Sequence, residues 1–392
     1  MLATVVAALA VVPASAAADA GRNRVVLGSY VGNANGNEPA AMRSFKQSYD
    51  QNVAAMGGAR PRYFNVFTDF GQPPETWAKS ASWAAWSSKQ SGDAYIGPGS
   101  GSIPLVGVPL ASNTLGWGKV DAFYQDVIAG RYDDVYAGIV DAYADNGYKT
   151  IDFRIAYEFN GNFMPWAPGN SKAPNARADF VAAFRHVADI LHRQGKAKHV
   201  QALVHWNPAA INDTSYDVAS LYPGDAYVDV IAVDLYNTMY PLTLADWTKG
   251  GKGDATDRQS WAASLDNRTH YWRYPNASRR TPTPKLGNWG WSIAQTIDMA
   301  KLHGKPMGVD ETGTGTAHGA LALNDDPEFP RFLARVLGEA RDKGVTVHNV
   351  NIWDITVGDG AWQFRGGRQP KAAAAWAACF GGASRDPSRR TC

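Results

Sequence analysis

The sequence predicts an α/β protein of the (β/α)8 TIM barrel class, folded as a single domain. Short runs of β-branched and aromatic residues recur along the 392-residue chain, and amphipathic stretches of helical periodicity separate several of them. Nearly continuous apolar strands that alternate with helices are typical of a parallel sheet buried on both faces. Eight such strands are the number that closes this barrel.

Each expected strand is bounded by polar or turn-forming residues. The eight strands read RVVLGSYVG from Arg24, RYFNVFTDF from Arg62, IPLVGVPLA from Ile103, KTIDFRIAYE from Lys149, VQALVHW from Val200, YVDVIAVDLY from Tyr227, KPMGVDE from Lys305 and VTVHNVNIWD from Val345. The clearest helices cover 176–196 and 328–344, where Lys, Arg and Gly stand at the carboxyl ends as stop signals. An open doubly wound sheet is the alternative, but GSYVGNANG after the first strand lacks its GxGxxG turn.

The first residues have the composition of a signal peptide. An apolar run from Leu2 to Val12 leads into the small residues Ala14, Ser15 and Ala16. This run is too short to span a bilayer as a helix. We therefore expect a signal peptide over 1–18, a barrel domain over 22–380 and a carboxyl-terminal tail over 381–392. The expected location is extracytoplasmic, secreted or periplasmic, and a buried amino-terminal helix is the alternative.

The cysteines, histidines and net charge narrow the function classes. Cys379 and Cys392 are the only cysteines, and in an exported chain they can form one disulfide that ties the tail. The eight histidines show no HxH or HExxH spacing, which disfavours a metal-dependent barrel hydrolase. We expect neither a metal nor a cofactor.

A net charge of +2 indicates no nucleic-acid or membrane partner, and we expect a monomer.

Polar and aromatic residues stand where several predicted strands end. Barrel enzymes carry their active sites at the carboxyl ends of the strands, so these residues are the candidates for function. Packing alone does not explain so many polar residues at the ends of apolar strands. The candidates are Asp69, Glu158, Trp206, Asn207, Asp234, Tyr236, Glu311, Trp353 and Asp354.

Two of these candidates, Glu158 and Glu311, form a carboxylate pair. They end the fourth and seventh predicted strands, which face one another across the mouth of an eight-stranded barrel. Hydrolysis of a glycosidic bond with retention uses two carboxyl groups roughly 5–5.5 Å apart, one as acid and one as nucleophile. Alternation along the fourth strand turns Arg154 inward with Glu158. The guanidinium would keep Glu311 ionised, and a structural ion pair inside the barrel is the alternative.

Four segments in order along the chain resemble glycoside hydrolase family 26. RIAYEFNGNFMPW (154–166) is similar to the acid/base segment of that family, and GKPMGVDETG (304–313) is similar to the strand that carries its nucleophile. YPGDAYVDVIAVDLYN (222–237) and NVNIWD (349–354) resemble its sixth and eighth strands. The resemblance spans more than half of the chain, while the first three strands resemble the family only weakly.

The resemblance implies a retaining endo-β-glycan hydrolase that acts on a polysaccharide or oligosaccharide. Glu158 would be the acid/base and Glu311 the nucleophile, with Tyr236 donating a hydrogen bond to the nucleophile and Trp353 lying under a sugar ring. For each tryptophan, core packing is the alternative. The implied substrate-binding residues are Arg154, Tyr157, Asn160, Trp166, Trp206, Asp234, Tyr236 and Trp353.

Two departures from the family pattern bear on the substrate. The β-mannanases of the family carry a histidine immediately before the acid/base, where this chain has Tyr157, and VGVPL replaces the cleft tryptophan of the third strand. Alternation would also turn Tyr157 away from Glu158 unless a bulge re-aims it. Mannan is therefore doubtful, and mixed-linkage glucan, 1,3-xylan and bacterial exopolysaccharide stay open.

Two other function classes are alternatives to a hydrolase, and one long segment also needs an interpretation. A non-catalytic glycan-binding barrel would keep the cleft without turnover, but both glutamates are present. A polysaccharide lyase would use Tyr157 or Tyr236 as base and release unsaturated products. The long connection 237–288 is predicted to form a wall or lid of the cleft, with a packed surface excursion as the alternative.

Overall fold

The computed structural model describes residues 25–115, 120–161, 163–170, 176–211, 216–237, 263–273, 290–317, 324–357, 360–381 and 392. The predicted signal peptide over 1–18 lies outside the described residues, as does most of the predicted lid over 237–288. Within the described part of the chain, none of the helices has the length and apolar character that crossing a membrane requires.

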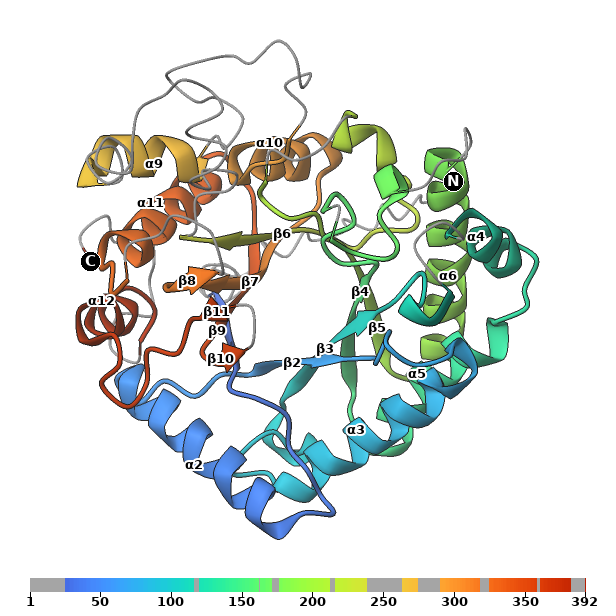
Figure 1. Cartoon of the computed structure of the whole chain (residues 1–392), viewed down its shortest axis with the longest axis horizontal. Coiled ribbons are helices and arrows are strands. Elements are labelled where there is room, and N and C mark those ends of the chain that lie inside the picture. Colours follow the sequence, from blue (N-terminus) through green and yellow to red (C-terminus); the bar gives the residue numbers. More distant parts are fainter. Residues whose placement is uncertain are drawn as a thin grey trace, which may run out of the picture.

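Eight parallel strands close into a barrel in chain order, which confirms the predicted fold class. Figure 1 looks into this ring of strands, with the helices arranged around it. The open doubly wound alternative is excluded because the last strand pairs with the first. The strands are β1 (Val26–Tyr30), β2 (Tyr63–Phe67), β3 (Ile103–Val108), β4 (Thr150–Ile155), β5 (Gln201–Trp206), β6 (Val230–Tyr236), β7 (Met307–Gly313) and β9 (Val347–Trp353).

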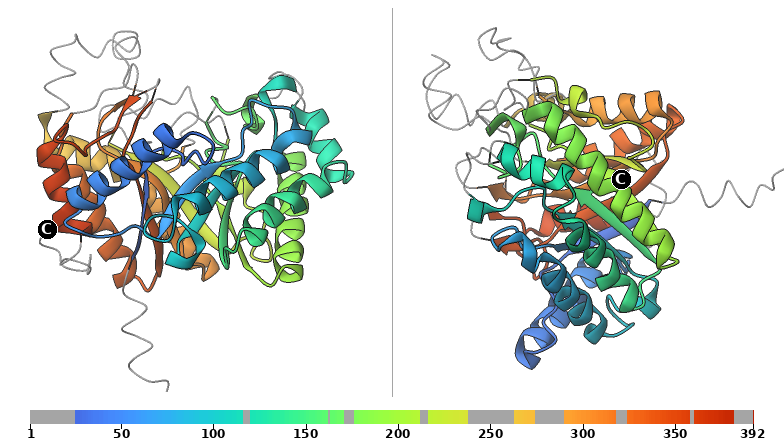
Figure 2. Two further views of the ribbon diagram at one scale, coloured as in Figure 1. Left: turned by 90° about the horizontal axis from the view of Figure 1, so that it is seen from below. Right: turned by 90° about the vertical axis from the view of Figure 1, so that its right-hand side faces the viewer.

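Helices cover the outside of the barrel, and Figure 2 shows this layer from two further sides. The two helices predicted most clearly are α6 and α11, and both begin at the predicted residue. The helices are α2 (Pro39–Ala55), α3 (Trp77–Ser91), α4 (Val120–Ile128), α5 (Asp133–Asp145), α6 (Ala176–Ala197), α9 (Leu265–Arg273), α10 (Ile293–His303), α11 (Glu328–Asp342) and α12 (Pro370–Phe380). Short 3-10 turns are η1 (Pro74–Thr76), η2 (Pro98–Ser100), η3 (Asn113–Leu115), η4 (Pro168–Asn170) and η5 (Val218–Leu221).

A small antiparallel sheet lies where the chain leaves β7 and β9. Its strands are β8 (Thr316–Ala317), β10 (Thr356–Val357) and β11 (Gly360–Ala361). In Figure 1 it lies beside β7 and β9. Since β8 follows β7 and β10 follows β9, this sheet belongs to the carboxyl-terminal rim of the barrel, where barrel enzymes place their active sites.

The fourth strand ends earlier than the sequence predicts. β4 stops at Ile155, and the two residues Ala156 and Glu158 have left-handed backbone angles, with φ of 48° and 52°. Backbone hydrogen bonds hold this turn, from Ala156 N to Val108 O and from Glu158 N to Asn207 O, each 2.8 Å long. The prediction that alternation extends from Arg154 to Glu158 is therefore wrong beyond Ile155, because the strand has already ended there.

Two irregularities in strand pairing re-aim side chains into the barrel. The β6–β7 register joins Val233 to Val309 and Asp234 to Glu311, and so passes over Asp310. A residue left unpaired by a bulge shifts the alternation of the strand, so both Asp310 and Glu311 face the interior. Their side chains contact His205 and Arg154, which come from β5 and β4.

The second irregularity is in β9. Its register with β7 joins Met307 to Val347 and Gly308 to Asn349, and so passes over His348. The imidazole of His348 is consequently within 2.8 Å of Asp152 on β4 inside the barrel.

At the carboxyl end, Cys379 of α12 is joined to Cys392 by a disulfide. In the described part of 237–288, Trp272 of α9 is buried and packs on Phe329 and Phe332 of α11. This part of the segment packs on the outer helices, which is the surface excursion left open as the alternative to a lid.

Candidate active site

The side chain of Glu311 is held from two sides at the mouth of the barrel. Arg154 Nη1 donates to its Oε1 at 2.5 Å, and the Tyr236 hydroxyl donates to its Oε2 at 2.9 Å. β7 supplies the carboxylate, while β4 and β6 supply the two donors. Both carboxylate oxygens therefore accept a hydrogen bond, which fixes the orientation of this group.

Arg154 forms the centre of a buried charged cluster. Its guanidinium also donates to Asp234 through Nη2 and to Asn207 Oδ1 through Nε at 2.9 Å, and Nε lies 3.6 Å from Asp310. Burial alone would lower the pKa of Arg154, but the three carboxylates Asp234, Glu311 and Asp310 raise it above its usual value. Arg154 therefore stays positively charged under Glu311.

Arg154 and Asp234 were predicted to bind substrate, and the structure instead places both below the mouth. Their side chains have no exposed surface. Asp234 accepts from Arg154 and from Asn207 Nδ2, the latter at 3.0 Å. Burial, together with the charges of Glu311 and Glu158, raises the pKa of Asp234 against the opposing effect of Arg154. These two residues position Glu311 and do not reach a ligand.

The ring of Tyr157 lies over the guanidinium of Arg154, with 4.9 Å between the ring centre and Arg154 Cζ. Tyr157 is 5% exposed. It is the residue that replaces the histidine of the family pattern, and the left-handed turn, not a strand bulge, aims it here. Gly107 on β3 makes this placement possible, because a Cβ there would lie 2.8 Å from the Tyr157 ring. The small residue in VGVPL thus accommodates the large residue at 157.

Glu158 lies at the same mouth as Glu311. It is half-buried in the turn after β4. Both carboxylates raise the pKa values of Asp234, Tyr157 and Tyr236, although burial is the largest cause in each case. Glu158 follows the end of β4 and Glu311 lies near the end of β7, so both stand at the carboxyl-terminal end of the barrel and act on the same three groups.

Three further predictions of substrate contact are wrong, because the side chains are in the core. Asn160 is buried and exchanges two hydrogen bonds with the backbone of Ala209, at 2.7 and 2.8 Å. Trp166 and Trp206 have no exposed surface, and their indole N–H groups donate to the carbonyls of Tyr157 and Leu221. For both tryptophans the structure shows the core packing left open as the alternative.

Tyr30, Tyr236, Trp353 and Trp362, at the ends of β1, β6 and β9 and just after β11, form what we call the aromatic wall. Trp353, half-buried at the end of β9, lies 4.2 Å from the ring of Tyr30 at the end of β1. Trp362, just after β11, lies 5.3 Å from Tyr236. Among the described residues, the buried indole N–H groups of Trp353 and Trp362 have no hydrogen-bond partner. A buried donor without a partner is costly, so these two N–H groups are suited to a ligand hydroxyl.

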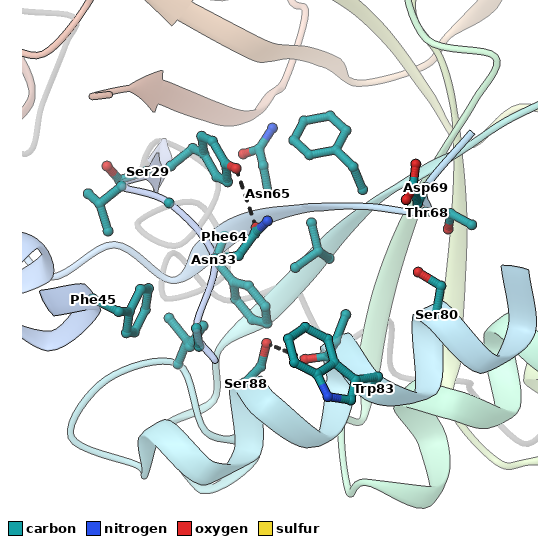
Figure 3. Close-up of a pocket in the computed structure, with 18 of the residues that line it drawn as sticks. Ser29, Asn33, Phe45, Phe64, Asn65, Thr68, Asp69, Ser80, Trp83 and Ser88 are labelled. Atoms are coloured by element: carbon teal, nitrogen blue, oxygen red, sulfur yellow. Dashed lines mark hydrogen bonds between the residues drawn. The ribbon is translucent and has the colours of Figure 1, made fainter. Parts of the chain in front are cut away.

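A cavity of about 370 Å³ adjoins this wall through Tyr30, Phe67 and Tyr157. Its remaining lining combines aromatic and polar side chains from β1, β2, α2 and α3. Figure 3 shows Trp83 and Ser80 of α3 on one side of the cavity and Asp69 near the end of β2. Rings combined with a few polar groups are the usual lining of small-molecule sites.

Comparison with known proteins identifies a similar sequence family and similar structures. Residues 122–249 match the sequence profile of Glycosyl hydrolase family 26. This part of the chain is similar to that family. A stretch of 90 residues is 41% identical to Endoglucanase H of Acetivibrio thermocellus and covers 23% of this chain and 10% of that relative. The match therefore spans about a tenth of the length of this curated relative.

The GH26C structure from Muricauda sp. MAR_2010_75 superposes with a TM-score of 0.52 at 13% identity, over 91% of this chain and 86% of that one. This likeness shows the shared fold. A GH26 β-mannanase structure from Bacteroides ovatus has a TM-score of 0.47 at 14% identity, over 94% of this chain and 91% of that one.

Below the mouth, the interior of the barrel holds a second polar cluster. His205 lies between Asp310 and Asp152, with Nδ1 at 2.9 Å from one and Nε2 at 3.0 Å from the other. Burial alone would lower the pKa of His205, but the two aspartates raise it to about 10. Burial alone would raise the pKa of Asp152, and His205 and His348 lower it to about 2. Asp152, His205 and His348 together are a set of side chains able to hold a metal ion.

Sequence reasoning missed Tyr30, Trp362, Asp310 and this second cluster. Tyr30 ends β1 just as Trp353 ends β9, so extending the same strand-end criterion to the first strand would have found it. Burial and the charge of Glu311 raise the pKa of Tyr30 to about 12. Asp310 could not be found from strand alternation, since the bulge turns it inward.

Proposed function

We propose that this chain is a secreted, retaining, endo-acting β-glycan hydrolase. Glu311 would be the nucleophile and Glu158 the acid/base. The observation that carries the proposal is the fixed orientation of Glu311, which accepts from Arg154 and Tyr236 at a mouth that it shares with Glu158. A charged, oriented carboxylate opposite a second carboxyl group is the arrangement that double displacement requires.

In the first step, Glu311 attacks the anomeric carbon while Glu158 protonates the leaving glycosidic oxygen, so the C–O bond breaks as the glycosyl-enzyme ester forms. In the second step, Glu158 takes a proton from water, and the water oxygen displaces Glu311 from the anomeric carbon. Before attack, Arg154 holds the Glu311 carboxylate in place through its hydrogen bond to Oε1. Its buried positive charge also stabilises Glu311 as a leaving group in the second step.

The aromatic wall supports a carbohydrate substrate. The half-buried ring of Trp353 offers a flat apolar face, and the indole N–H groups of Trp353 and Trp362 offer donors for sugar hydroxyls. The neighbouring cavity, lined by Tyr30 and Trp83 among others, extends the site away from the two glutamates. A chain of several sugar units is accommodated better by such an extended site than a single sugar is.

Two observations bear on which polymer is the substrate: the names of similar proteins and the residue at position 157. The similar segment of 90 residues lies in a protein named an endoglucanase, whereas the Bacteroides ovatus neighbour is a β-mannanase. Because Tyr157 replaces the histidine of the mannanase pattern, a β-glucan is our first candidate and mannan the comparison.

The lyase alternative is not favoured by the described geometry. The Tyr236 hydroxyl donates to Glu311, and burial together with Glu311 raises its pKa well above the usual value. Burial likewise raises the pKa of Tyr157 despite the opposing charge of Arg154. Neither phenol is therefore suited to act as a base near neutral pH.

The test is reducing-end release by the full chain from a panel of β-glucans, mannan, 1,3-xylan and bacterial exopolysaccharides, with Glu311→Gln as the control. We expect release by the wild type alone, and NMR of the first product formed should show the anomeric configuration of the substrate. Inverted product would refute retention. Ultraviolet-absorbing products would favour a lyase, and tight binding without release would favour a glycan-binding barrel.

Export is tested separately by the amino terminus of the protein recovered from its native host. We expect the mature chain to begin after about residue 18, following the small-residue segment Pro13 to Ala16. Recovery of Met1 on the mature protein would refute the signal peptide.

A further inference from the structure

The second polar cluster continues from His205, which contacts Asp310, toward the amino ends of β2 and β9. Tyr63 is the first residue of β2 and His348 the second residue of β9, so both stand at the amino ends of their strands. Asp152 of β4 and His205 of β5 complete the cluster. Four strands that are far apart in sequence thus meet in one group of side chains.

The four side chains converge on one point. Asp152 Oδ2 lies 3.0 Å from His205 Nε2, 2.8 Å from His348 Nε2 and 2.8 Å from the Tyr63 hydroxyl. The Tyr63 hydroxyl is also 2.8 Å from His348 Nε2. The second carboxylate oxygen, Asp152 Oδ1, is buried and has no hydrogen-bond partner among the described residues.

We propose that Asp152, His205 and His348 bind a structural zinc ion at the amino-terminal end of the barrel, with the Tyr63 hydroxyl or water as the fourth ligand. Two imidazole nitrogens and one carboxylate form a donor set typical of Zn²⁺ sites, whereas Ca²⁺ and Mg²⁺ prefer oxygen donors alone. The ligand atoms of the three residues all lie within 4.8 Å of one another.

The distances fit this ion after a small adjustment. Zinc bonds of about 2.0–2.1 Å in a tetrahedron place ligand atoms about 3.3 Å apart. The present separations of 2.8–3.0 Å around Asp152 Oδ2 must therefore widen by a few tenths of an ångström. Coordination through the unpartnered Asp152 Oδ1 would leave the hydrogen bond from Tyr63 to Oδ2 in place.

A second carboxylate already orients one of the ligands. His205 Nδ1 lies 2.9 Å from Asp310 Oδ2, which directs Nε2 of the same ring at Asp152. Such a carboxylate–histidine pair behind the metal is the usual support of a zinc ligand. On binding, Zn²⁺ would replace the proton that His205 Nε2 shares with Asp152, and that proton would go to solvent.

The site has one accessible ligand. The side chain of His348 is 22% exposed, whereas Asp152 and His205 are fully buried. An ion would therefore enter past His348 at the amino-terminal face of the barrel. The bound ion would join β4 and β5 to β9 across the interior, so its expected effect is on stability.

The first experiment uses the full chain, treated with a chelator and dialysed, and then titrated with Zn²⁺ alone by calorimetry at about pH 8, where binding must release the proton that His205 shares with Asp152. We expect one equivalent to bind. At a free Zn²⁺ concentration about 100 times the Kd, we expect Tm to rise by roughly 4 °C. No binding, or no change in Tm, would overturn the proposal. No substrate is present, so the outcome is independent of the proposed hydrolase activity.

Two variants localise the ion. His348→Gln removes a ligand and keeps a donor for Asp152, and we expect it to weaken zinc binding at least about 10-fold. The matched control is His192→Ala, because His192 also pairs with an aspartate, at 2.7 Å from Asp229, and is 29% exposed. We expect the control to bind like the wild type. Unchanged affinity in His348→Gln would place the ion elsewhere and overturn the proposal.

A measurement on the wild type covers the case in which His348→Gln does not fold. In ¹⁵N NMR of the imidazole rings, Zn²⁺ should shift the Nε2 signals of His205 and His348 and leave those of His186, His192 and His303 unchanged. Shifts at the latter histidines, with none at the former, would refute the site.

Discussion

Glu311 and Asp354 occupy equivalent places on neighbouring strands and differ in almost everything else. Each stands at the carboxyl end of its strand region, at β7 and just after β9. Each is also paired with an arginine, Glu311 with Arg154 at 2.5 Å and Asp354 with Arg365 at 3.3 Å. Strand-end position therefore places both among the candidates, and the pairing with Glu158 and the family resemblance single out Glu311.

The hydrogen-bond partners of Asp354 and Glu311 distinguish the roles of the two carboxylates. Asp354 is fully buried and accepts from Asn52 of α2 at 2.8 Å and from the backbone N–H groups of Phe364 and Arg365 at 2.8 and 3.2 Å. These bonds fasten the chain after β9 to α2. Glu311, in contrast, faces the mouth that it shares with Glu158. Strand-end position identifies candidates, and the direction and partners of the side chain decide which of them can meet a ligand.

The largest effect should come from Glu311→Gln. We expect kcat on the polymer to fall about 10,000-fold or more, because an amide cannot form the glycosyl-enzyme ester. The variant should stay folded, since Gln still accepts from Arg154 through its oxygen. Steady-state kinetics and thermal unfolding check both statements. Activity within tenfold of the wild type would show that Glu311 is not the nucleophile and does not differ from Asp354 in role.

Glu158→Gln should have the next largest effect, and its size should depend on the leaving group. Loss of general acid catalysis costs about 100- to 10,000-fold on the polymer. Aryl glycosides with acidic phenol leaving groups need little protonation, so we expect their first step to be much less affected. The measurement is pre-steady-state release of the phenol. An equal loss on both substrates would contradict an acid role for Glu158.

The fold was predictable because burial sets the pattern of its strands. All eight barrel strands and the starts of α6 and α11 follow from apolar runs and helical periodicity. For the predicted site, Glu158, Glu311, Tyr236 and Trp353 all lie at or just after the carboxyl ends of their strands, and their roles stay predictions. Tyr236 donates to Glu311 as the family resemblance implies.

The remaining features depend on backbone geometry that no local pattern reveals. The left-handed turn at Ala156 and Glu158 sets the direction of Tyr157, and the bulges at Asp310 and His348 break the alternation. Strand-end tryptophans were ambiguous for a different reason. Trp206 and Trp353 both end strands, and only their surroundings show that the first is in the core and the second at the mouth.

Asp354→Asn should change the pH dependence of stability and have far less effect on kcat than Glu311→Gln. Burial, opposed by Arg365, raises the pKa of Asp354 to about 6 from 3.8. The folded state therefore binds the proton more tightly than the unfolded state does, and the contribution of Asp354 to stability falls as pH rises from about 4 to about 6. We expect this decline, about 1–3 kcal/mol, to be absent in the variant.

Chemical denaturation of the wild type and of Asp354→Asn at several pH values between about 4 and 7 measures this difference. Equal slopes for the two proteins would assign the decline to other groups. A loss of kcat as large as that of Glu311→Gln would show that the two strand-end carboxylates do not differ in role.

A smaller loss of kcat than those of the two glutamate variants is expected for Tyr236→Phe, which tests how much the fixed orientation of Glu311 matters. The change removes one hydrogen bond to Oε2 and leaves the bond from Arg154 and the packing of the ring on Trp362. A hydrogen bond to a charged group contributes about 1.5–3 kcal/mol, so we expect kcat to fall roughly 10- to 100-fold with little change in KM. Tyr236 would be the base in one form of the lyase alternative, so complete loss of turnover would favour that mechanism. A kcat within twofold of the wild type would show that Arg154 alone orients the nucleophile.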